Sequence, residues 1–145
     1  NLDFSIGFYT QIGNKVLNAK RMNRDVFTDG NYDLDFYQNA WRPDRPSQTY
    51  PSAAAYNTAF IQQANSFFVE DASYLRIQNI QVGYTFRNLR QISSMRISFT
   101  AQRPFTFFRY NGFTPEVSGS PIASGVDMST YPMQGIYTLG LKLSF

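Results

Sequence analysis

The sequence predicts an all-β fold of four antiparallel strands joined by long loops. Apolar and polar residues alternate over four segments, and a period of two is the side-chain period of a strand. Aromatic residues make up 17% of the chain and are mostly Phe and Tyr, which pack well on pleated surfaces. Segments rich in Pro, Gly, Asn and Ser separate the strands, and these residue types favour turns and loops.

The first predicted strand covers Leu2 to Ile12. Every second residue is apolar, with Leu2, Phe4, Ile6 and Phe8 on one face and Asp3, Ser5 and Gly7 on the other. The alternation already runs at the first residue, which is Asn and not Met. We therefore expect the chain to be a piece of a longer protein.

The second predicted strand covers Tyr74 to Phe86 and changes phase along its length. Leu75 and Ile77 share one parity, whereas the apolar residues that follow have the other: Ile80, Val82, Tyr84 and Phe86. One extra residue near Gln78 or Asn79, a β-bulge, would return both sets to the same face.

The third and fourth predicted strands alternate without interruption. The third covers Met95 to Ala101, and the fourth covers Ile136 to Phe145. In the fourth, one face is wholly apolar and carries Tyr137, Leu139, Leu141, Leu143 and Phe145. The opposite face is largely polar and carries Lys142, which suits a strand between lipid and a wet lumen.

The connections favour a membrane barrel over a compact soluble domain. Arg87 to Ser94 is short, whereas Gly13 to Ser73 and Gln102 to Gly135 are long. Long irregular connections are uncommon in compact domains, but barrels of the bacterial outer membrane alternate short periplasmic turns with long external loops. Ala53 to Phe68 predicts a short helix in the first long loop. Four strands cannot close a barrel, which needs about eight, so we expect a fragment or one subunit of a closed oligomer.

Composition argues against several classes of function. The formal charge is +3 without a basic run, which argues against nucleic-acid binding. The chain has no Cys and no His, so it lacks the thiol nucleophile and the commonest general base, and we expect neither an enzyme nor a cofactor. No segment approaches the about 20 apolar residues of a membrane helix. Glu70 and Asp71 are adjacent, so on a strand they point to opposite faces and could not flank one substrate bond.

The first long loop contains the candidate binding residues. Aromatic faces can stack on sugar rings while charged groups bond hydroxyls, and the substrate-binding candidates are Tyr32, Tyr37, Trp41, Arg42 and Tyr50. The interpretation that we favour is that these rings pack the loop's own small core or face a partner protein. Asp29, Asn31, Asp33 and Asp35 have a calcium-like spacing, but Leu34 and Ala40 replace the Gly and acid of an EF-hand loop, so we expect a turn and no metal.

Several segments, taken together, resemble the carboxyl end of SusC/RagA-family TonB-dependent outer-membrane transporters: Trp41 to Pro51, Phe68 to Ile80 with Gly83-Tyr84, Gly112 to Ser118, Tyr131-Pro132 and Gly140 to Phe145. The resemblance implies that residues 1–145 are the last part of a 22-stranded transmembrane β-barrel, without its plug domain. It also implies the last two large extracellular loops. Arg103-Pro104 and Phe113-Thr114 depart from the family's usual Asn-Leu and Tyr-Asp.

The same resemblance implies a function and partners. Family members import oligosaccharides, and in some cases peptides, with energy that TonB delivers to the plug, and many work beneath a SusD-like surface lipoprotein. The polar faces of the strands would line the lumen, with Asp3, Ser5, Arg76, Arg96, Ser98 and Lys142. The resemblance further implies a barrel-assembly signal in the apolar face of the fourth strand, which comprises Tyr137, Leu139, Leu141, Leu143 and Phe145.

Two other classes of protein are compatible with the strand pattern. A soluble all-β carbohydrate-binding module would have to bury Phe4, Ile6, Phe8, Leu139, Leu141 and Leu143 in its interior, whereas a transporter segment would expose them to lipid. A passive porin or receptor without TonB coupling differs only in sequence that precedes this chain.

Overall fold

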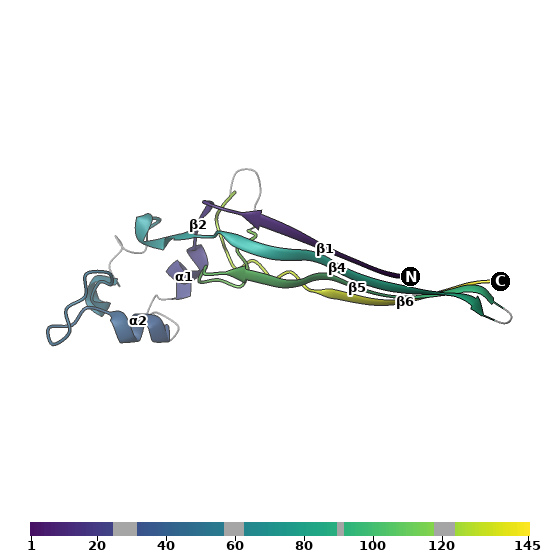
Figure 1. Cartoon of the computed structure of the whole chain (residues 1–145). Helices are drawn as coiled ribbons and strands as arrows, with labels where there is room; N and C mark the ends of the chain where they lie inside the picture. Colours follow the sequence, from purple (N-terminus) through teal and green to yellow (C-terminus); the bar gives the residue numbers. More distant parts are fainter. Residues whose placement is uncertain (25–31, 57–62, 90–91, 118–123) are drawn as a thin grey trace. The chain divides into compact units, whose positions relative to one another are not determined.

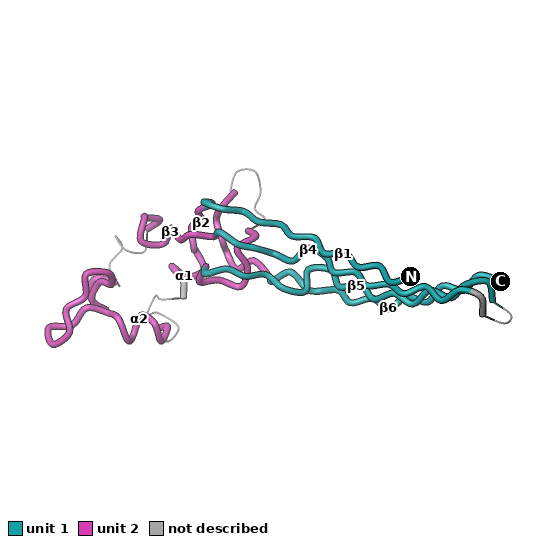
Figure 2. Tube along the Cα trace, viewed as in Figure 1, with its two compact units in different colours: residues 1–14, 73–109, 132–145 teal, residues 15–72, 110–131 magenta. Residues whose placement is uncertain are grey.

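The computed structural model describes residues 1–24, 32–56, 63–89, 92–117 and 124–145. These residues form two units, shown in different colours in Figure 2. Unit 1 comprises Asn1–Asn14, Ser73–Arg109 and Pro132–Phe145, and unit 2 comprises Lys15–Ala72 and Tyr110–Tyr131. Each of the two long connections predicted from the sequence therefore contributes to unit 2, whereas the predicted strands form unit 1.

Unit 1 is one antiparallel sheet with the strand order β1-β4-β5-β6 (Figure 1). The strands are β1 (Leu2–Gln11), β4 (Tyr74–Leu89), β5 (Ile92–Phe108) and β6 (Ile136–Ser144). All four strands predicted from the sequence are confirmed. β4 and β5 form a hairpin whose pairing reaches Leu89 and Ile92, as the short connection predicted.

The pairing register places the apolar residues of all four strands on one face. Phe4 pairs with Val82, Val82 with Phe99, and Phe99 with Leu139. Because paired residues of an antiparallel sheet share a face, this row is apolar from edge to edge. Neighbouring rows are also largely apolar, so the sheet has one continuous apolar face, which comprises Leu2, Phe4, Ile6, Phe8, Leu75, Ile77, Ile80, Val82, Tyr84, Phe86, Met95, Ile97, Phe99, Ala101, Phe105, Phe107, Tyr137, Leu139, Leu141 and Leu143.

The predicted β-bulge lies in β4 at Gln78. Ile80 pairs with Ile6 and Ile77 pairs with Phe8. Between these two pairs β4 therefore contains one residue more than β1. The extra residue returns Leu75 and Ile77 to the face of Ile80 and Val82, as the change of phase predicted.

β5 extends seven residues past the predicted end at Ala101, to Phe108. Pro104 lies within this extension and cannot donate a ladder hydrogen bond. In the structure the pairing skips Arg103 and Pro104, since Gln102 pairs with Asn79 and Phe105 pairs with Ile77. Arg103 has a φ of 51°, the left-handed conformation found at some bulges. Pro104 therefore lies where the ladder is already interrupted, and the strand continues beyond it.

The apolar face has the height of a membrane barrel's lipid-facing band. It runs along β4 from Leu75 to Phe86, which is about ten residue steps once the bulge is discounted. At roughly 3.3 Å per step this is about 33 Å, and a strand tilt of about 40° reduces it to about 25 Å along the membrane normal, the band height of outer-membrane barrels.

Unit 2 contains short elements around an aromatic core. β2 (Lys15–Leu17) pairs with β3 (Val69–Asp71), and the helices are α1 (Ala19–Arg24), α2 (Leu34–Asn39), α3 (Ala53–Tyr56) and the 3-10 turn η1 (Ser66–Phe68). Of the helix predicted over Ala53 to Phe68, the structure shows α3 at its start. Residues 63–65 are not helical and η1 is a separate 3-10 turn, because Asn65 before it is extended; residues 57–62 lie outside the described residues. None of the described helices is long and apolar enough to cross a membrane.

Candidate functional site in the first long loop

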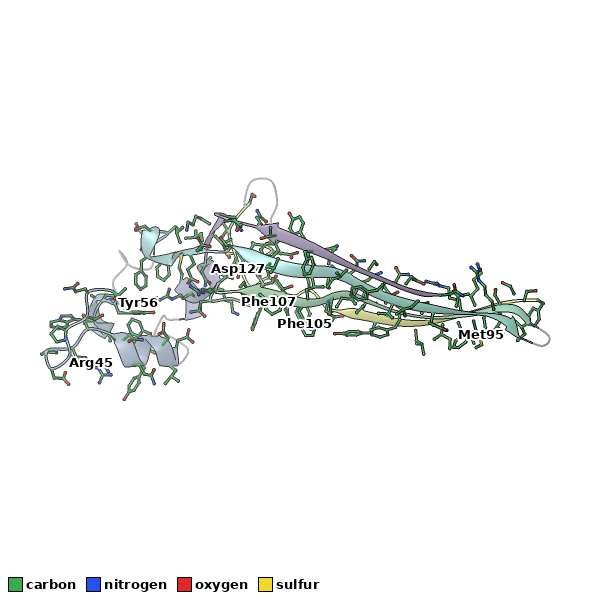
Figure 3. All side chains as sticks on the ribbon, in the orientation of Figure 1. Arg45, Tyr56, Met95, Phe105, Phe107 and Asp127 are labelled. Carbon is green, nitrogen blue, oxygen red and sulfur yellow. The ribbon has the colours of Figure 1, made fainter. Side chains whose placement is uncertain are left out.

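The aromatic residues of the first long loop divide into a packed core and an exposed surface. Phe36 and Tyr56 are buried with Ala40 and Phe68, and the ring centroids of Phe36 and Tyr56 are 4.5 Å apart. Figure 3 labels Tyr56 within this unit. Two predicted substrate-binding residues pack against this core. The ring centroid of Tyr32 lies 4.8 Å from that of Phe36, and the ring centroid of Tyr50 lies 6.1 Å from it.

Arg21 joins this core to a polar network. It is 8% exposed and its guanidinium bonds the Glu70 carboxylate at 3.1 Å and the Tyr50 hydroxyl at 3.2 Å. The same group lies 4.9 Å from the centre of the Phe67 ring, within the range of a cation–π contact. Burial opposes its charge, but the contacts with Tyr50 and Glu70 outweigh burial and raise the pKa of Arg21.

Tyr50 connects Arg21 to helix α2. Its hydroxyl donates a hydrogen bond to the carboxylate of Asp35, while it accepts one from Arg21. Burial, and next the bond to Asp35, raise the pKa of Tyr50 to about 12. Tyr50 therefore remains a neutral donor at physiological pH and fixes α2 against Arg21.

Glu70 and Asp71 have separate structural partners, as their opposite faces on a strand predicted. The Glu70 carboxylate accepts hydrogen bonds from Arg21, from the Asn18 side chain at 3.2 Å and from the backbone N–H of Asn111 at 2.9 Å. Asp71 pairs with Lys15 at 2.7 Å. Glu70 thereby holds together three segments that are far apart in sequence.

Asp127 is a second junction that the sequence analysis missed. One of its carboxylate oxygens accepts hydrogen bonds from the backbone N–H groups of Ser129 and Thr130, and the other accepts the Tyr110 hydroxyl at 2.7 Å. Burial opposes the charge, but these bonds lower the pKa of Asp127. Its backbone also bonds Leu17. The signal that would have revealed it is an Asp two and three residues before Ser and Thr, the pattern of an Asx turn.

The other predicted substrate-binding residues lie at the surface around α2. Tyr37 and Trp41 are exposed, at 59% and 41%, and the Arg42 guanidinium lies 5.0 Å from the centre of the Tyr37 ring. Arg45, labelled in Figure 3, lies in the same segment. The structure thus brings the side chains of Tyr37 and Arg42 together at the surface, leaves Trp41 exposed beside Arg42 in the sequence, and packs Tyr32 and Tyr50, both partly buried, against the core. Whether any of the five contacts substrate stays a prediction.

The predicted lumen residues all lie on the polar face of the sheet, opposite the apolar face. Arg96 on β5 forms a two-pronged ion pair with Asp3 on β1, with both N–O distances 2.6 Å. Between these strands lies Gly83 of β4, where an added Cβ would stand 2.3 Å from the Arg96 guanidinium. Glycine at position 83 therefore lets Arg96 lie flat across β4 to reach Asp3.

The predicted assembly row lies on the apolar face of β6 and is exposed. Tyr137, Leu139, Leu141 and Leu143 belong to β6, and Phe145 follows it with 88% of its surface exposed. The structure places these side chains as the alternation predicted, and their role in assembly stays a prediction.

The calcium-like segment falls partly outside the described residues, because Asp29 and Asn31 are not described. Asp33 precedes α2, and the Asp35 side chain bonds Asn39 at 2.8 Å as well as Tyr50. In the described part of the chain, no group of three acidic residues is arranged to hold a metal ion.

Comparisons with known proteins identify relatives that are much longer than this chain. It is 31% identical to the TonB-dependent receptor SusC of Bacteroides thetaiotaomicron over all of the chain and 14% of that protein. It is 27% identical to the TonB-dependent receptor P26 of Formosa agariphila, again over all of the chain and 16% of the relative. No family model matches the chain.

Solved structures show the same relationship. The chain matches the RagAB peptide importer in its open-open state with a TM-score of 0.79 and 26% identity, over 99% of the chain and 16% of that structure. The closed-closed state matches with a TM-score of 0.77. The four-stranded sheet is therefore part of a barrel and not a closed barrel. The chain is a SusC/RagA-like segment of a TonB-dependent receptor, and it matches the carboxyl-terminal part of that family of bacterial outer-membrane proteins.

Proposed function

We propose that this chain forms part of the wall and the external loops of a TonB-dependent transporter that imports oligosaccharides or peptides. The continuous apolar face of the sheet carries this proposal, because its height suits the lipid-facing band of a barrel and its opposite face is polar. One similar structure is named a peptide importer, which supports this class of activity. The partners we propose are TonB, acting through a plug outside this chain, and a SusD-like surface lipoprotein.

A soluble carbohydrate-binding module is disfavoured by the burial of the sheet. Such a module must cover its apolar strand faces with a second layer of protein. The six side chains that distinguish the two classes are instead exposed by 40% to 79%: Phe4, Ile6, Phe8, Leu139, Leu141 and Leu143. An exposed apolar face of this extent marks an interaction with lipid or protein, and in a barrel wall lipid covers it.

Uptake by cells that express the full-length protein tests the proposal. We expect labelled peptides or oligosaccharides to enter only when both this protein and TonB are present. Uptake that continues without TonB would indicate a passive porin, and a full-length protein found outside the outer membrane would contradict the transporter class.

The exposed aromatic residues provide a sharper test of the loop. Replacing both Tyr37 and Trp41 with Ala should lower uptake several-fold while the protein remains folded in the membrane, because neither side chain belongs to the buried core. The matched control is Tyr131→Ala, which removes a ring that is 74% exposed from the second long loop. Equal uptake by the double variant, the control and the unmodified protein would argue against a functional first loop.

A further inference from the structure

Helix α2 has an apolar face on each side. Phe36 and Ala40 face the core of unit 2, whereas Leu34 and Tyr37, about one helical turn apart, are exposed by 69% and 59%. Trp41 follows the end of the helix at Asn39 and is 41% exposed. Packing against the core accounts for the first set of side chains. The second set remains exposed among the described residues, and exposed apolar side chains grouped on one surface indicate a binding site.

Two arginines stand beside these exposed side chains. Arg42 and Arg45 are the ends of a tight turn, in which the backbone N–H of each bonds the carbonyl of the other at 3.1 and 3.0 Å. Their side chains turn back to the same acceptor, because the Nη2 atoms of Arg42 and Arg45 donate to the Tyr37 carbonyl at 3.3 and 3.4 Å. The turn and the shared carbonyl together hold two positive groups close to one another.

Neither arginine forms an ion pair with a carboxylate within the described ranges, and this includes Asp44, which lies between them in the sequence. The described ion pairs involve other basic residues, namely Lys15, Arg21 and Arg96. The nearby Asp35 carboxylate is occupied by Asn39 and Tyr50. Each guanidinium has five N–H donors and one Tyr37 carbonyl satisfies few of them, so donors remain for a ligand.

We propose that Arg42 and Arg45 form a carboxylate-binding site, with Leu34, Tyr37 and Trp41 as its apolar neighbours, and that its ligand is a peptide with acidic side chains. This inference rests on the proposed function and specifies the class of substrate. A guanidinium fork matches the geometry of a carboxylate. Trp, Tyr and Arg are also the residue types that dominate protein-binding hot spots, and an exposed Leu favours a peptide side chain over a sugar.

The site is held by the core and not by a long flexible loop. Tyr50 bonds Asp35 of α2 and Arg21, and Arg21 bonds Glu70. This chain of contacts fixes α2, and therefore the Tyr37 carbonyl that orients both arginines. Preorganisation of this kind lowers the entropy lost when a ligand binds.

Binding to the full-length protein in detergent tests the proposal with four probes. They are a short peptide containing Asp, Glu and Leu, the same peptide with Asn and Gln in place of the acids, an oligogalacturonate, and a neutral malto-oligosaccharide. We expect the acidic peptide to bind about tenfold or more tightly than its amide counterpart, as charge-assisted hydrogen bonds allow. The double variant Arg42→Gln, Arg45→Gln should abolish that preference, and added salt should weaken it in the unmodified protein.

The control variant is Arg87→Gln, which removes the same charge from an exposed position near the far end of β4. It should retain the preference for the acidic peptide. Equal affinity for the two peptides, a preference that survives in the double variant, or tighter binding of the oligogalacturonate would overturn the proposed site. If one of these results is found and cells still import the amide peptide, the proposed transport function holds without the carboxylate-binding site. If cells import none of the four probes, both the transport function and the carboxylate-binding site are contradicted.

Discussion

Tyr50 shows how far a residue's role depends on partners that are distant in sequence. From sequence it was an aromatic residue in a polar loop and therefore a reasonable ligand contact. In the structure Arg21, 29 residues away, and Asp35, 15 residues away, both bond its hydroxyl. No local pattern predicts such contacts, because they depend on how the loop folds onto itself. The interpretation favoured from the sequence, in which the loop's own rings form a small core or face a partner, includes this outcome for Tyr50.

The buried ion pair of Arg21 and Glu70 also depends on residues that are distant in sequence. Removing one partner of a buried ion pair leaves the other uncompensated, which typically costs about 3–5 kcal/mol. The sequence did not reveal that these two residues form a pair, since they are 49 positions apart. From the sequence, Glu70 was only argued not to act with Asp71 in catalysis, because adjacent acids on a strand cannot face one substrate bond.

The ionisation of Tyr50 gives a prediction for alkaline pH. Its pKa is raised from 10.0 to about 12 in the folded protein, so the folded state favours the neutral phenol. The stabilisation is fully present below about pH 10 and is lost as the pH rises from there through about 12. In the full-length protein, the phenolate absorbance that disappears in Tyr50→Phe should therefore titrate near pH 12.

The variant Asp35→Asn provides the control for this titration. It removes the carboxylate that raises the Tyr50 pKa but leaves the burial of the ring, so the midpoint should fall part of the way toward 10. A difference titration centred near pH 10 in the unmodified protein would contradict the contacts described for Tyr50.

At the scale of elements, strands with a regular period were predictable and short elements were not. β1, β4 and β6 were predicted to within a few residues at each end, because alternation over ten or more positions is a strong signal. β2 and β3 have three residues each, too few for a period, and their pairing depends on tertiary contacts. β5 was predicted to end at Ala101, but it continues past the bulge at Arg103 and Pro104 to Phe108.

The two faces of β6 provide a prediction about the sheet. Leu139 of β6 pairs with Phe99 near the middle of the apolar face, whereas the adjacent Thr138 lies on the polar face. Leu139→Arg should lower the free energy of unfolding of the full-length protein in lipid vesicles by about 2–4 kcal/mol, the cost of Arg near the bilayer midplane. Denaturant titration measures this difference.

Thr138→Arg is the matched control, because it adds the same group one residue away on the other face. We expect its unfolding free energy to remain close to that of the unmodified protein. If both variants lose the same amount of stability, the apolar face is not the one in contact with lipid.

For the whole molecule, the sequence was sufficient to predict a barrel segment but not its loops. The apolar face, the alternation of short and long connections and the family resemblance all pointed to the same class. The interior of unit 2 was not predictable, since Asp127, Tyr110 and Leu17 come together from both long connections. Substrate recognition belongs to this less predictable part, and the exposed surface at α2 became visible only when the core beneath it was known.

Phe145 provides a prediction about assembly of the whole protein. It continues the apolar row of β6 beyond Ser144 and is 88% exposed, so no contact within the described residues requires so large a ring there. We propose that the ring acts while the barrel is being assembled, as the family resemblance implies. Phe145→Ala in the full-length protein should therefore lower the amount of folded protein in the outer membrane, measured by pulse–chase as the fraction that migrates as a folded barrel.

Two control variants separate an assembly role from a stability role. Ser144→Ala changes the neighbouring residue of the opposite face and should assemble normally, and Phe145→Tyr keeps an aromatic ring and should restore the yield. The Phe145→Ala protein that does reach the membrane should unfold at close to the normal denaturant concentration, because the ring contributes to recognition more than to packing. An unchanged yield and assembly rate in Phe145→Ala would rule out the assembly role, and a large loss of stability with a normal assembly rate would assign the ring to the barrel wall instead.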